Sequence, residues 1–136
     1  MAQHATMQDT FRWEQQGDPE LLADLRLQLR RYLTPTVVPA DVAADMILSL
    51  HEAAKNALRA AGGRPVEVLV WADGNLLRAR VRDHGAGFRV AGGRRCPRVW
   101  QTHGRGLYLM RSLMDSVDID CSDGVTISMS KRRLPD

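Results

Sequence analysis

The amino-acid sequence predicts an α/β two-layer sandwich, in which a mixed, mostly antiparallel sheet is covered on one face by helices. Three observations predict it. Two stretches with helical apolar spacing follow a short strand-like run, a hairpin follows them, and a further helix and hairpin end the chain. At 136 residues the chain fits one domain, which we expect at 11–131, between tails at 1–10 and 132–136.

The first half of the chain is expected to form a strand and two helices. Residues 11–14 alternate apolar and polar side chains, as an edge strand does. Asp18-Pro19-Glu20 is a typical helix start, and Thr34-Pro35 ends that helix. A second helix is expected at 39–61, where Gly62-Gly63 ends it. This helix is apolar over most of its circumference, so we expect it to be largely buried.

The second half is expected to form two hairpins around a third helix. Residues 66–71 and 76–81 are predicted strands, joined by the turn sequence Asp73-Gly74-Asn75. A helix is predicted at 104–115, followed by strands at 117–120 and 125–129. Residues 88–103 show no period, and a stretch of that length inside a small domain is usually functional or disordered. We predict that it forms a lid over a ligand.

Composition narrows the function classes. The net charge of +3 allows a nucleic-acid partner, but two Phe and two Tyr offer little base stacking and no basic run is sustained, so we expect none. No apolar run approaches the ~20 residues of a membrane span, and the first ten residues lack the apolar segment of a signal peptide. We therefore expect a cytoplasmic protein without membrane contact, in which Cys96 and Cys121 are reduced thiols.

Glu52 and Asn56 form the first candidate motif, four residues apart on the predicted second helix. Their side chains share one helical face. An amide oxygen can serve as a single protein ligand of Mg²⁺ when phosphates supply the rest, and a carboxylate one turn away can accept a proton from a hydroxyl. The alternative is a solvated polar stripe on an amphipathic helix, and this motif alone does not decide between them.

Asp83 begins the second motif, directly after a predicted strand, with Gly85 and Gly87 at alternate positions. Glycines there let the backbone turn and approach a flat ligand closely. The carboxylate can accept a hydrogen bond from an exocyclic amine such as that of adenine. The alternative is an ordinary turn at a strand end, for which Asp and Gly are also favoured.

Gly104-Arg105-Gly106-Leu107 is the third motif, at the start of the predicted third helix. Backbone N–H groups at a helix start bind anions. The preceding stretch is rich in arginines, whose guanidinium groups suit phosphate: Arg89, Arg94, Arg95 and Arg98. Neither the dinucleotide fingerprint nor the Walker P-loop is present. Capping glycines and solvated loop arginines are the alternative.

In this order and spacing, the three motifs resemble the N, G1 and G2 boxes of the gyrase, histidine-kinase and mismatch-repair (GHKL) ATPase superfamily. The strings LSLHEAAKNALRAAG, RARVRDHGAGF and THGRGLYLMRSLMD most resemble the small anti-sigma-factor serine kinases, and the likeness spans roughly residues 11–131. The resemblance implies the Bergerat fold and Mg-ATP binding. In active members it also implies phosphorylation of a small anti-sigma-factor antagonist.

The resemblance also implies a role for each motif residue. By it, Glu52 is the general base, Asn56 the Mg²⁺ ligand and Asp83 the acceptor of the adenine amine. Thr126, in a predicted strand, matches a threonine that supports the adenine-binding aspartate. The remaining nucleotide-binding residues are expected to be Gly85, Gly87, Arg94, Arg95, Gly104, Arg105, Gly106 and Leu107.

Three functions remain open from the sequence. The first is a serine/threonine protein kinase that also acts as an anti-sigma factor, with a sigma factor and an antagonist as partners. The second is a non-catalytic, ATP-gated protein-binding module. The third is a detached ATPase of the gyrase or mismatch-repair type, which the lack of a transducer domain after residue 131 disfavours. The apolar residues at 21–33 fit homodimerisation or packing on the sheet equally well.

Overall fold

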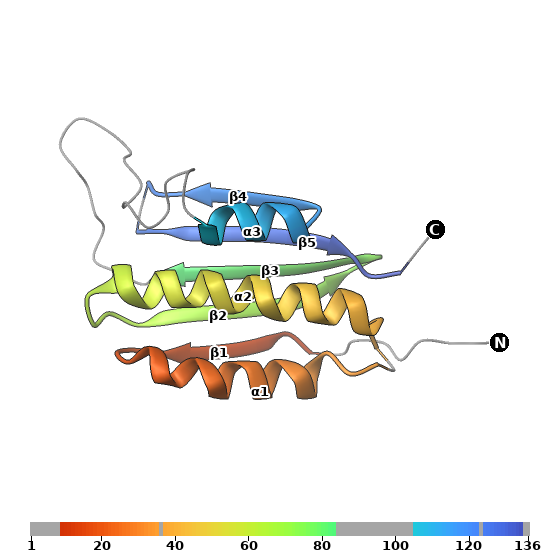
Figure 1. Cartoon of the computed structure of the whole chain (residues 1–136), viewed down its shortest axis with the longest axis horizontal. Coiled ribbons are helices and arrows are strands. Elements are labelled where there is room, and N and C mark those ends of the chain that lie inside the picture. Colours follow the sequence, from red (N-terminus) through yellow and green to blue (C-terminus); the bar gives the residue numbers. More distant parts are fainter. Residues whose placement is uncertain (1–8, 36, 84–104, 123, 135–136) are drawn as a thin grey trace.

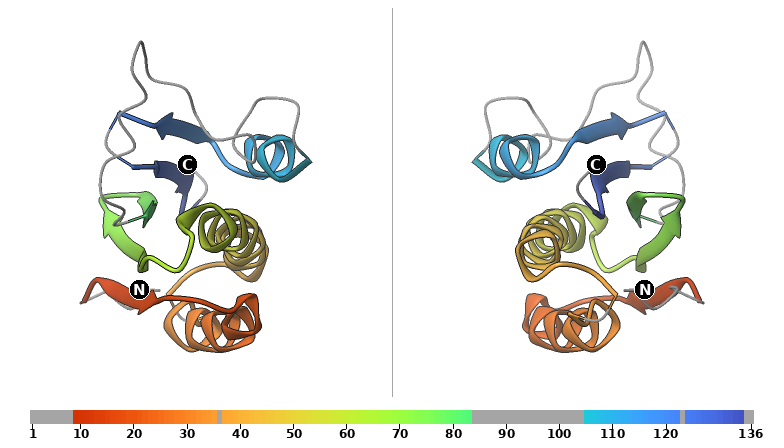
Figure 2. Two further views of the ribbon diagram at one scale, coloured as in Figure 1. Left: turned by 90° about the vertical axis from the view of Figure 1, so that its left-hand side faces the viewer. Right: turned by 90° about the vertical axis from the view of Figure 1, so that its right-hand side faces the viewer.

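The chain folds into two layers, a five-stranded sheet and a layer of helices on one of its faces (Figures 1 and 2). The computed structural model describes residues 9–35, 37–83, 105–122 and 124–134. Within them the elements are β1 (Phe11–Gln15), a 3-10 turn η1 (Pro19–Leu21), α1 (Leu22–Tyr32), α2 (Ala40–Ala61), β2 (Val66–Asp73), β3 (Leu76–Asp83), α3 (Arg105–Leu113), β4 (Ser116–Asp120) and β5 (Thr126–Arg132). The predicted two-layer α/β sandwich is confirmed.

The sheet has the strand order β1-β2-β3-β5-β4. All four neighbouring pairs of these described strands are antiparallel, so the parallel component expected of a mixed sheet is not found in them. Alternation along β3 directs Leu77, Ala79 and Val81 toward the helices, because side chains of a strand point to opposite faces in turn. Asp83, two residues further, lies on this same buried face.

The helix boundaries follow local chemistry. Asp18 accepts a hydrogen bond from the backbone N–H of Glu20 at 2.9 Å, so it caps a 3-10 turn, and the α-helix begins only at Leu22. α2 begins directly after Pro39 and ends at Gly62, whose φ of 59° is the left-handed conformation that favours glycine. The predicted second helix is therefore confirmed to within one residue at its start.

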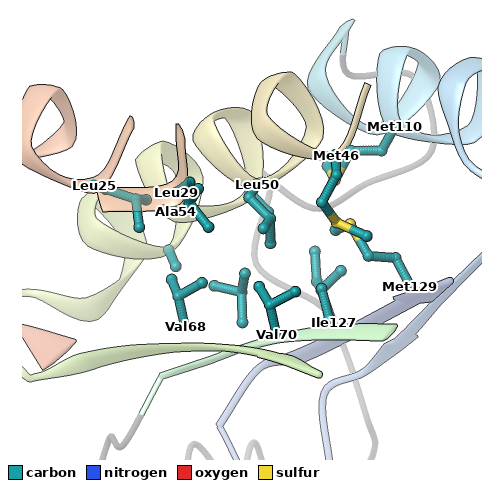
Figure 3. Packing of buried hydrophobic residues seen from close by; sticks show 14 of the residues in the cluster. Leu25, Leu29, Met46, Leu50, Ala54, Val68, Val70, Met110, Ile127 and Met129 are labelled. Atoms are coloured by element: carbon teal, nitrogen blue, oxygen red, sulfur yellow. The ribbon is translucent and has the colours of Figure 1, made fainter. Parts of the chain in front are cut away.

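The core lies between the helices and the sheet. Figure 3 shows side chains of α1 and α2 above those of β2 and β5. Met46 and Leu50 of α2 are fully buried, as are Val68 and Ile127 of the sheet. Burying one such side chain stabilises the folded state by about 1.5–3 kcal/mol. α2 is the central helix of the layer, and its orientation therefore fixes where its polar face meets the rest of the molecule.

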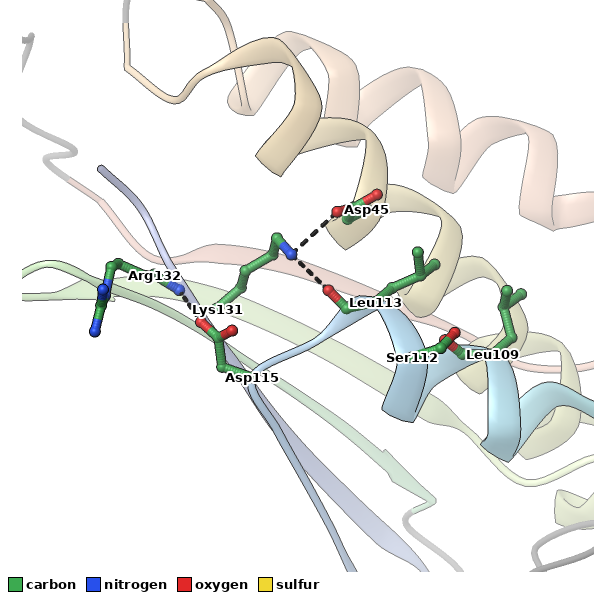
Figure 4. Close-up of polar contacts among 7 residues, drawn as sticks. All are labelled: Asp45, Leu109, Ser112, Leu113, Asp115, Lys131 and Arg132. Atoms are coloured by element: carbon green, nitrogen blue, oxygen red, sulfur yellow. Dashed lines mark hydrogen bonds and ion pairs between the residues drawn. The ribbon is translucent and has the colours of Figure 1, made fainter. Parts of the chain in front are cut away.

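Lys131 ties β5 to two helices (Figure 4). Its ammonium lies 3.0 Å from Asp45 of α2 and donates to the carbonyl of Leu113, the last residue of α3, at 2.5 Å. A cation at a helix C-terminus satisfies a free carbonyl and complements the helix dipole. The backbone N–H of Arg132 also donates to Asp115 at 2.6 Å. These contacts anchor the C-terminal end of α3.

Two further predictions differ from the structure. β5 extends one residue past the expected boundary at 131, to Arg132, and the backbone of Leu134 pairs with the side chain of Asn75 at 2.8 and 3.0 Å. The short terminal segment is thus held by the β2–β3 turn. Cys121 is disulfide-bonded rather than a reduced thiol, and Cys96 lies outside the described residues.

None of the described helices combines the length and the hydropathy needed to cross a lipid bilayer.

Candidate nucleotide site

Glu52 and Asn56 lie in the C-terminal half of α2, on the face turned toward α3. The side chain of Glu52 is 18% exposed, and Asn56 is 8% exposed. A solvated polar stripe would be more open to water than this. The structure therefore disfavours the surface-stripe alternative for these two residues and places them at a helix–helix contact.

Gly106, near the start of α3, approaches both side chains closely. A methyl group on its Cα would come within 2.8 Å of Asn56 Nδ2 and 3.4 Å of Glu52 Oε2. Only glycine allows this approach without displacing the amide. The first N–H groups of an α-helix have no partner within the helix, and the contact brings this end of α3 beside Glu52 and Asn56. The first and third sequence motifs thus meet in space.

Asp83 ends β3 at the same side of the molecule as the end of α2 and the start of α3 (Figure 1). It is 4% exposed, and its Oδ1 atom is buried without a hydrogen-bond partner among the described residues. A buried polar atom without a partner costs free energy, so such an atom in a native fold calls for an explanation. One explanation is that Asp83 Oδ1 accepts a hydrogen bond from a ligand.

The start of β5 positions Asp83 through its backbone. The N–H of Asp83 donates to the carbonyl of Val125 at 3.0 Å. A methyl group on Gly124, whose φ is 69°, would meet the carbonyl oxygen of Asp83 at 2.8 Å. Val125 and Gly124 therefore fix the place of the carboxylate, although neither was among the predicted site residues.

Thr126 lies on the sheet face opposite Asp83, whereas the family resemblance implied that it supports this aspartate. It pairs with Arg82, and the alternation of β3 and β5 puts Arg82 and Thr126 on the sheet face away from the helices, whereas Asp83 lies on the helix side. Thr126 instead lines a polar hollow on that open face with Arg80 and Arg82. The sequence did carry a signal, because the apolar neighbour Ile127 marks the buried face.

The other predicted residues divide between the described part of the chain and the rest. Leu107 is 1% exposed, so its side chain belongs to the core and only its backbone is free to line a phosphate. Arg105 is the first residue of α3, and its side chain is not among those described. The predicted lid at 88–103 and five predicted site residues lie outside the described part of the chain: Gly85, Gly87, Arg94, Arg95 and Gly104.

The donor set fits a nucleotide-bound Mg²⁺ better than an isolated metal. No group of three His, Cys, Asp or Glu side chains among the described residues could hold an ion by itself. Mg²⁺ on ATP takes most of its ligands from phosphate oxygens and water, and needs one or two from the protein. The nearly buried amide of Asn56, beside the start of α3, is chemically suited to supply one.

A groove between α1 and α2 also includes Glu52 in its lining. Its volume is about 670 Å³, and its lining is mostly apolar but includes His51 and Glu52. Arg26 donates to His51 Nδ1 at 2.9 Å across the groove. Burial, followed by the nearby Arg26 guanidinium, lowers the pKa of His51 below its ordinary value of 6.5. The sequence did not predict this groove, since it depends on how two helices pack.

Residues 16–131 match the family model described as a histidine kinase-like ATPase domain. The chain belongs to the histidine kinase-like ATPase family. The superfamily resemblance drawn from the motifs and the expected fold are thereby confirmed, and an ATP-binding role is supported.

A solved structure shows the same fold. The chain resembles a structure of the RsbU and RsbW domains of Rv1364c from Mycobacterium tuberculosis, with a TM-score of 0.68 and 19% sequence identity. The match covers 92% of this chain and 32% of that one, so this histidine kinase-like domain spans about a third of its structural relative. Among the curated proteins compared, none matches the sequence significantly.

Proposed function

We propose that this protein is an ATP-binding regulator, a serine/threonine protein kinase and anti-sigma factor that phosphorylates a small anti-sigma-factor antagonist. The family supports the ATP-binding part, and the RsbW domain in the structural relative supports the anti-sigma part. The observation that carries the proposal is the meeting of Glu52, Asn56 and Gly106 at the contact between α2 and α3. It brings together a carboxylate that would act as the base, an amide that would hold the metal, and the N-terminal N–H groups of α3.

Each residue has a separate task in this proposal. Asp83 accepts a hydrogen bond from the exocyclic amine of the base. The amide oxygen of Asn56 would serve as the protein ligand of the metal, and the N–H groups at the start of α3, including that of Gly106, would bind the phosphates. When bound, Mg-ATP supplies the phosphoryl group and the charge neutralisation that its transfer needs. Glu52 accepts the proton from the attacking serine or threonine hydroxyl.

The ion pair between Lys55 and Glu52 favours a second candidate, a non-catalytic ATP-gated binding module. Lys55 Nζ lies 2.8 Å from Glu52 Oε2, and both side chains are largely buried. A carboxylate held by an ammonium group has to give up that contact before it can accept a proton from a hydroxyl. If Lys55 stays in place when nucleotide binds, the same site would bind ATP without transferring phosphate.

The proposed partners follow from the proposed function. They are an antagonist protein that carries the acceptor hydroxyl and a sigma factor that the protein sequesters, and a homodimer is the proposed assembly. Because sigma factors act on RNA polymerase at DNA, the function places the protein in the cytoplasm.

The test is phosphoryl transfer from γ-labelled ATP to a partner that co-purifies from the native cell. Glu52→Gln keeps the size of the side chain and its hydrogen bonding but removes the base. We expect the variant to bind ATP as the wild type does and to transfer phosphate about 10²–10⁴-fold more slowly. Asp24→Asn, on α1, is the matched control and should transfer at the wild-type rate.

Two results would contradict the proposed kinase activity. Transfer by Glu52→Gln at the wild-type rate would show that Glu52 is not the base. A wild-type protein that binds its partner only with ATP, yet never phosphorylates it, would be the non-catalytic module. Lys55→Met separates the two candidates further, because release of Glu52 should raise the transfer rate of a kinase that this lysine restrains.

A further inference from the structure

Asp83 is not the only orphaned polar group at the end of β3. The Nε atom of Arg64 is also buried without a hydrogen-bond partner among the described residues. It lies 4.0 Å from Asp83 Oδ1, which is too far for a hydrogen bond and close enough for an ion pair. Two buried atoms of opposite character, one donor and one acceptor, thus lie close together, and neither has a hydrogen-bond partner among the described residues.

The fold holds this pair in place from both sides. Asp83 is the register partner of Val66, the first residue of β2, and Arg64 precedes Val66 by two residues. The backbone N–H of Arg64 donates to the carbonyl of Ala61 at 3.2 Å, so the turn that ends α2 fixes the arginine. The juxtaposition therefore results from the α2–β2 connection and the β2–β3 pairing, two rigid features of the domain.

The polarity of the pair matches one edge of adenine. That edge presents an amine donor at position 6 and, directly beside it, a ring nitrogen acceptor at position 1. An acceptor and a donor lying side by side complement both groups. We propose that Arg64 is a second base-recognition residue, whose Nε–H donates to the ring nitrogen beside the amine that Asp83 accepts, an inference that rests on the proposed ATP binding.

The arginine serves the carboxylate as well as the base. Because Arg64 does not hydrogen-bond Asp83 in the structure, it leaves the Oδ1 acceptor open while its positive charge offsets the buried negative one. A simple counter-ion would do only the second of these tasks. The two roles differ in what they predict for nucleotides that lack the ring nitrogen.

The affinities for three nucleotides, measured by calorimetry, distinguish base recognition by Arg64 from a role as counter-ion of Asp83. ATP has both groups, 1-deaza-ATP keeps the amine and lacks the ring nitrogen, and purine riboside triphosphate keeps the ring nitrogen and lacks the amine. We expect Arg64→Met to lower the affinity for ATP and for purine riboside triphosphate by about tenfold or more, and to leave 1-deaza-ATP within about twofold of the wild type. Asp83→Asn should instead lower the affinity for ATP and for 1-deaza-ATP.

Arg133→Met is the matched control, because Arg133 Nε is also buried without a hydrogen-bond partner in the described part of the chain. Arg133 follows β5 beside Asn75, at the other end of β3 from Asp83. It should bind all three nucleotides as the wild type does. Should Arg64→Met fold poorly, Arg64→Gln retains an N–H donor without the charge, and its preference for ATP over 1-deaza-ATP should persist in part.

The inference fails if Arg64→Met weakens the binding of 1-deaza-ATP as much as that of ATP, since loss of a counter-ion acting only through Asp83 would do that, or if its affinity for ATP is unchanged. Both outcomes leave the proposed function intact, because the wild type still binds ATP. Failure of the wild type to bind any of the three nucleotides would instead refute the proposed function and the recognition role together.

Discussion

Gly106 and Asn56 lie so close together that a single added methyl group would contact the amide at 2.8 Å. The glycine is near the start of α3 and the amide is on α2, fifty positions earlier in the chain. This approach joins two sequence motifs into one site, and it makes the site sensitive to a change that leaves every polar group in place.

Gly106→Ala should lower the affinity for Mg-ATP by about tenfold, because the new methyl group displaces the nearly buried Asn56 amide. The affinity is measured by calorimetry with Mg²⁺ present. Ser112→Ala, further along α3, is the control, since the Ser112 hydroxyl bonds only the local carbonyl of Leu109 among the described residues. Equal affinities for both variants would mean that the approach of α3 to Asn56 is not part of the site.

Gly124→Ala should damage nucleotide binding through the backbone of Asp83. The residue has φ of 69°, and a methyl group there would lie 2.8 Å from the Asp83 carbonyl oxygen. Gly74→Ala is a well-matched control, with φ of 59° but nothing within 4 Å of the added group. Both variants should lose about 1–3 kcal/mol of stability from backbone strain. Only Gly124→Ala should also bind ATP more weakly, and equal nucleotide binding would contradict this account.

Asp83→Asn should weaken ATP binding by about 1.5–3 kcal/mol, the worth of a hydrogen bond to a charged group. The carboxylate is nearly buried, and its Oδ1 atom accepts no hydrogen bond from the described residues. The substitution therefore removes no described hydrogen bond at that atom. Asp118→Asn, exposed on β4, serves as the comparison. Unchanged affinity in the Asp83 variant would remove it from base recognition.

Stability should fall on acidification in part through His51. Its pKa is lowered in the folded protein, chiefly by burial and then by Arg26, so the folded state favours the neutral imidazole. That contribution is fully present above the ordinary pKa of 6.5 and is lost as the pH falls through the lowered folded value. Thermal unfolding between about pH 5 and pH 7.5 should show a smaller loss of stability in His51→Gln than in the wild type. If the stability of His51→Gln fell with pH as steeply as that of the wild type, this role of His51 would be contradicted.

The elements were predictable where local spacing determines them. The apolar periodicity of residues 39–61 and the glycines after them placed α2 correctly, and the alternation on either side of Asp73-Gly74-Asn75 placed β2 and β3. The 3-10 turn before α1 was not predictable from the Asp-Pro-Glu start, because both helix types begin with the same cap.

The site was predictable only in part. The motif spacings predicted that Glu52, Asn56, Asp83 and Gly106 belong to one site. The structure places Gly106 beside Glu52 and Asn56. Arg64 has no local signal, since its nearness to Asp83 depends on the pairing of β2 with β3. Thr126 shows the reverse error, in which a motif match overrode the strand alternation that puts it on the open face.

Magnesium-dependent ATP binding tests the central claim most directly. Calorimetry should compare the wild type with Asn56→Ala, each with ATP alone and with ATP and Mg²⁺. We expect the wild type to bind ATP more tightly with the metal, and Asn56→Ala to lose most of that gain while keeping its weaker metal-free binding. A wild-type protein that binds no ATP at millimolar concentration, or an Asn56→Ala variant with the full magnesium effect, would contradict the nucleotide site described for α2, α3 and β3.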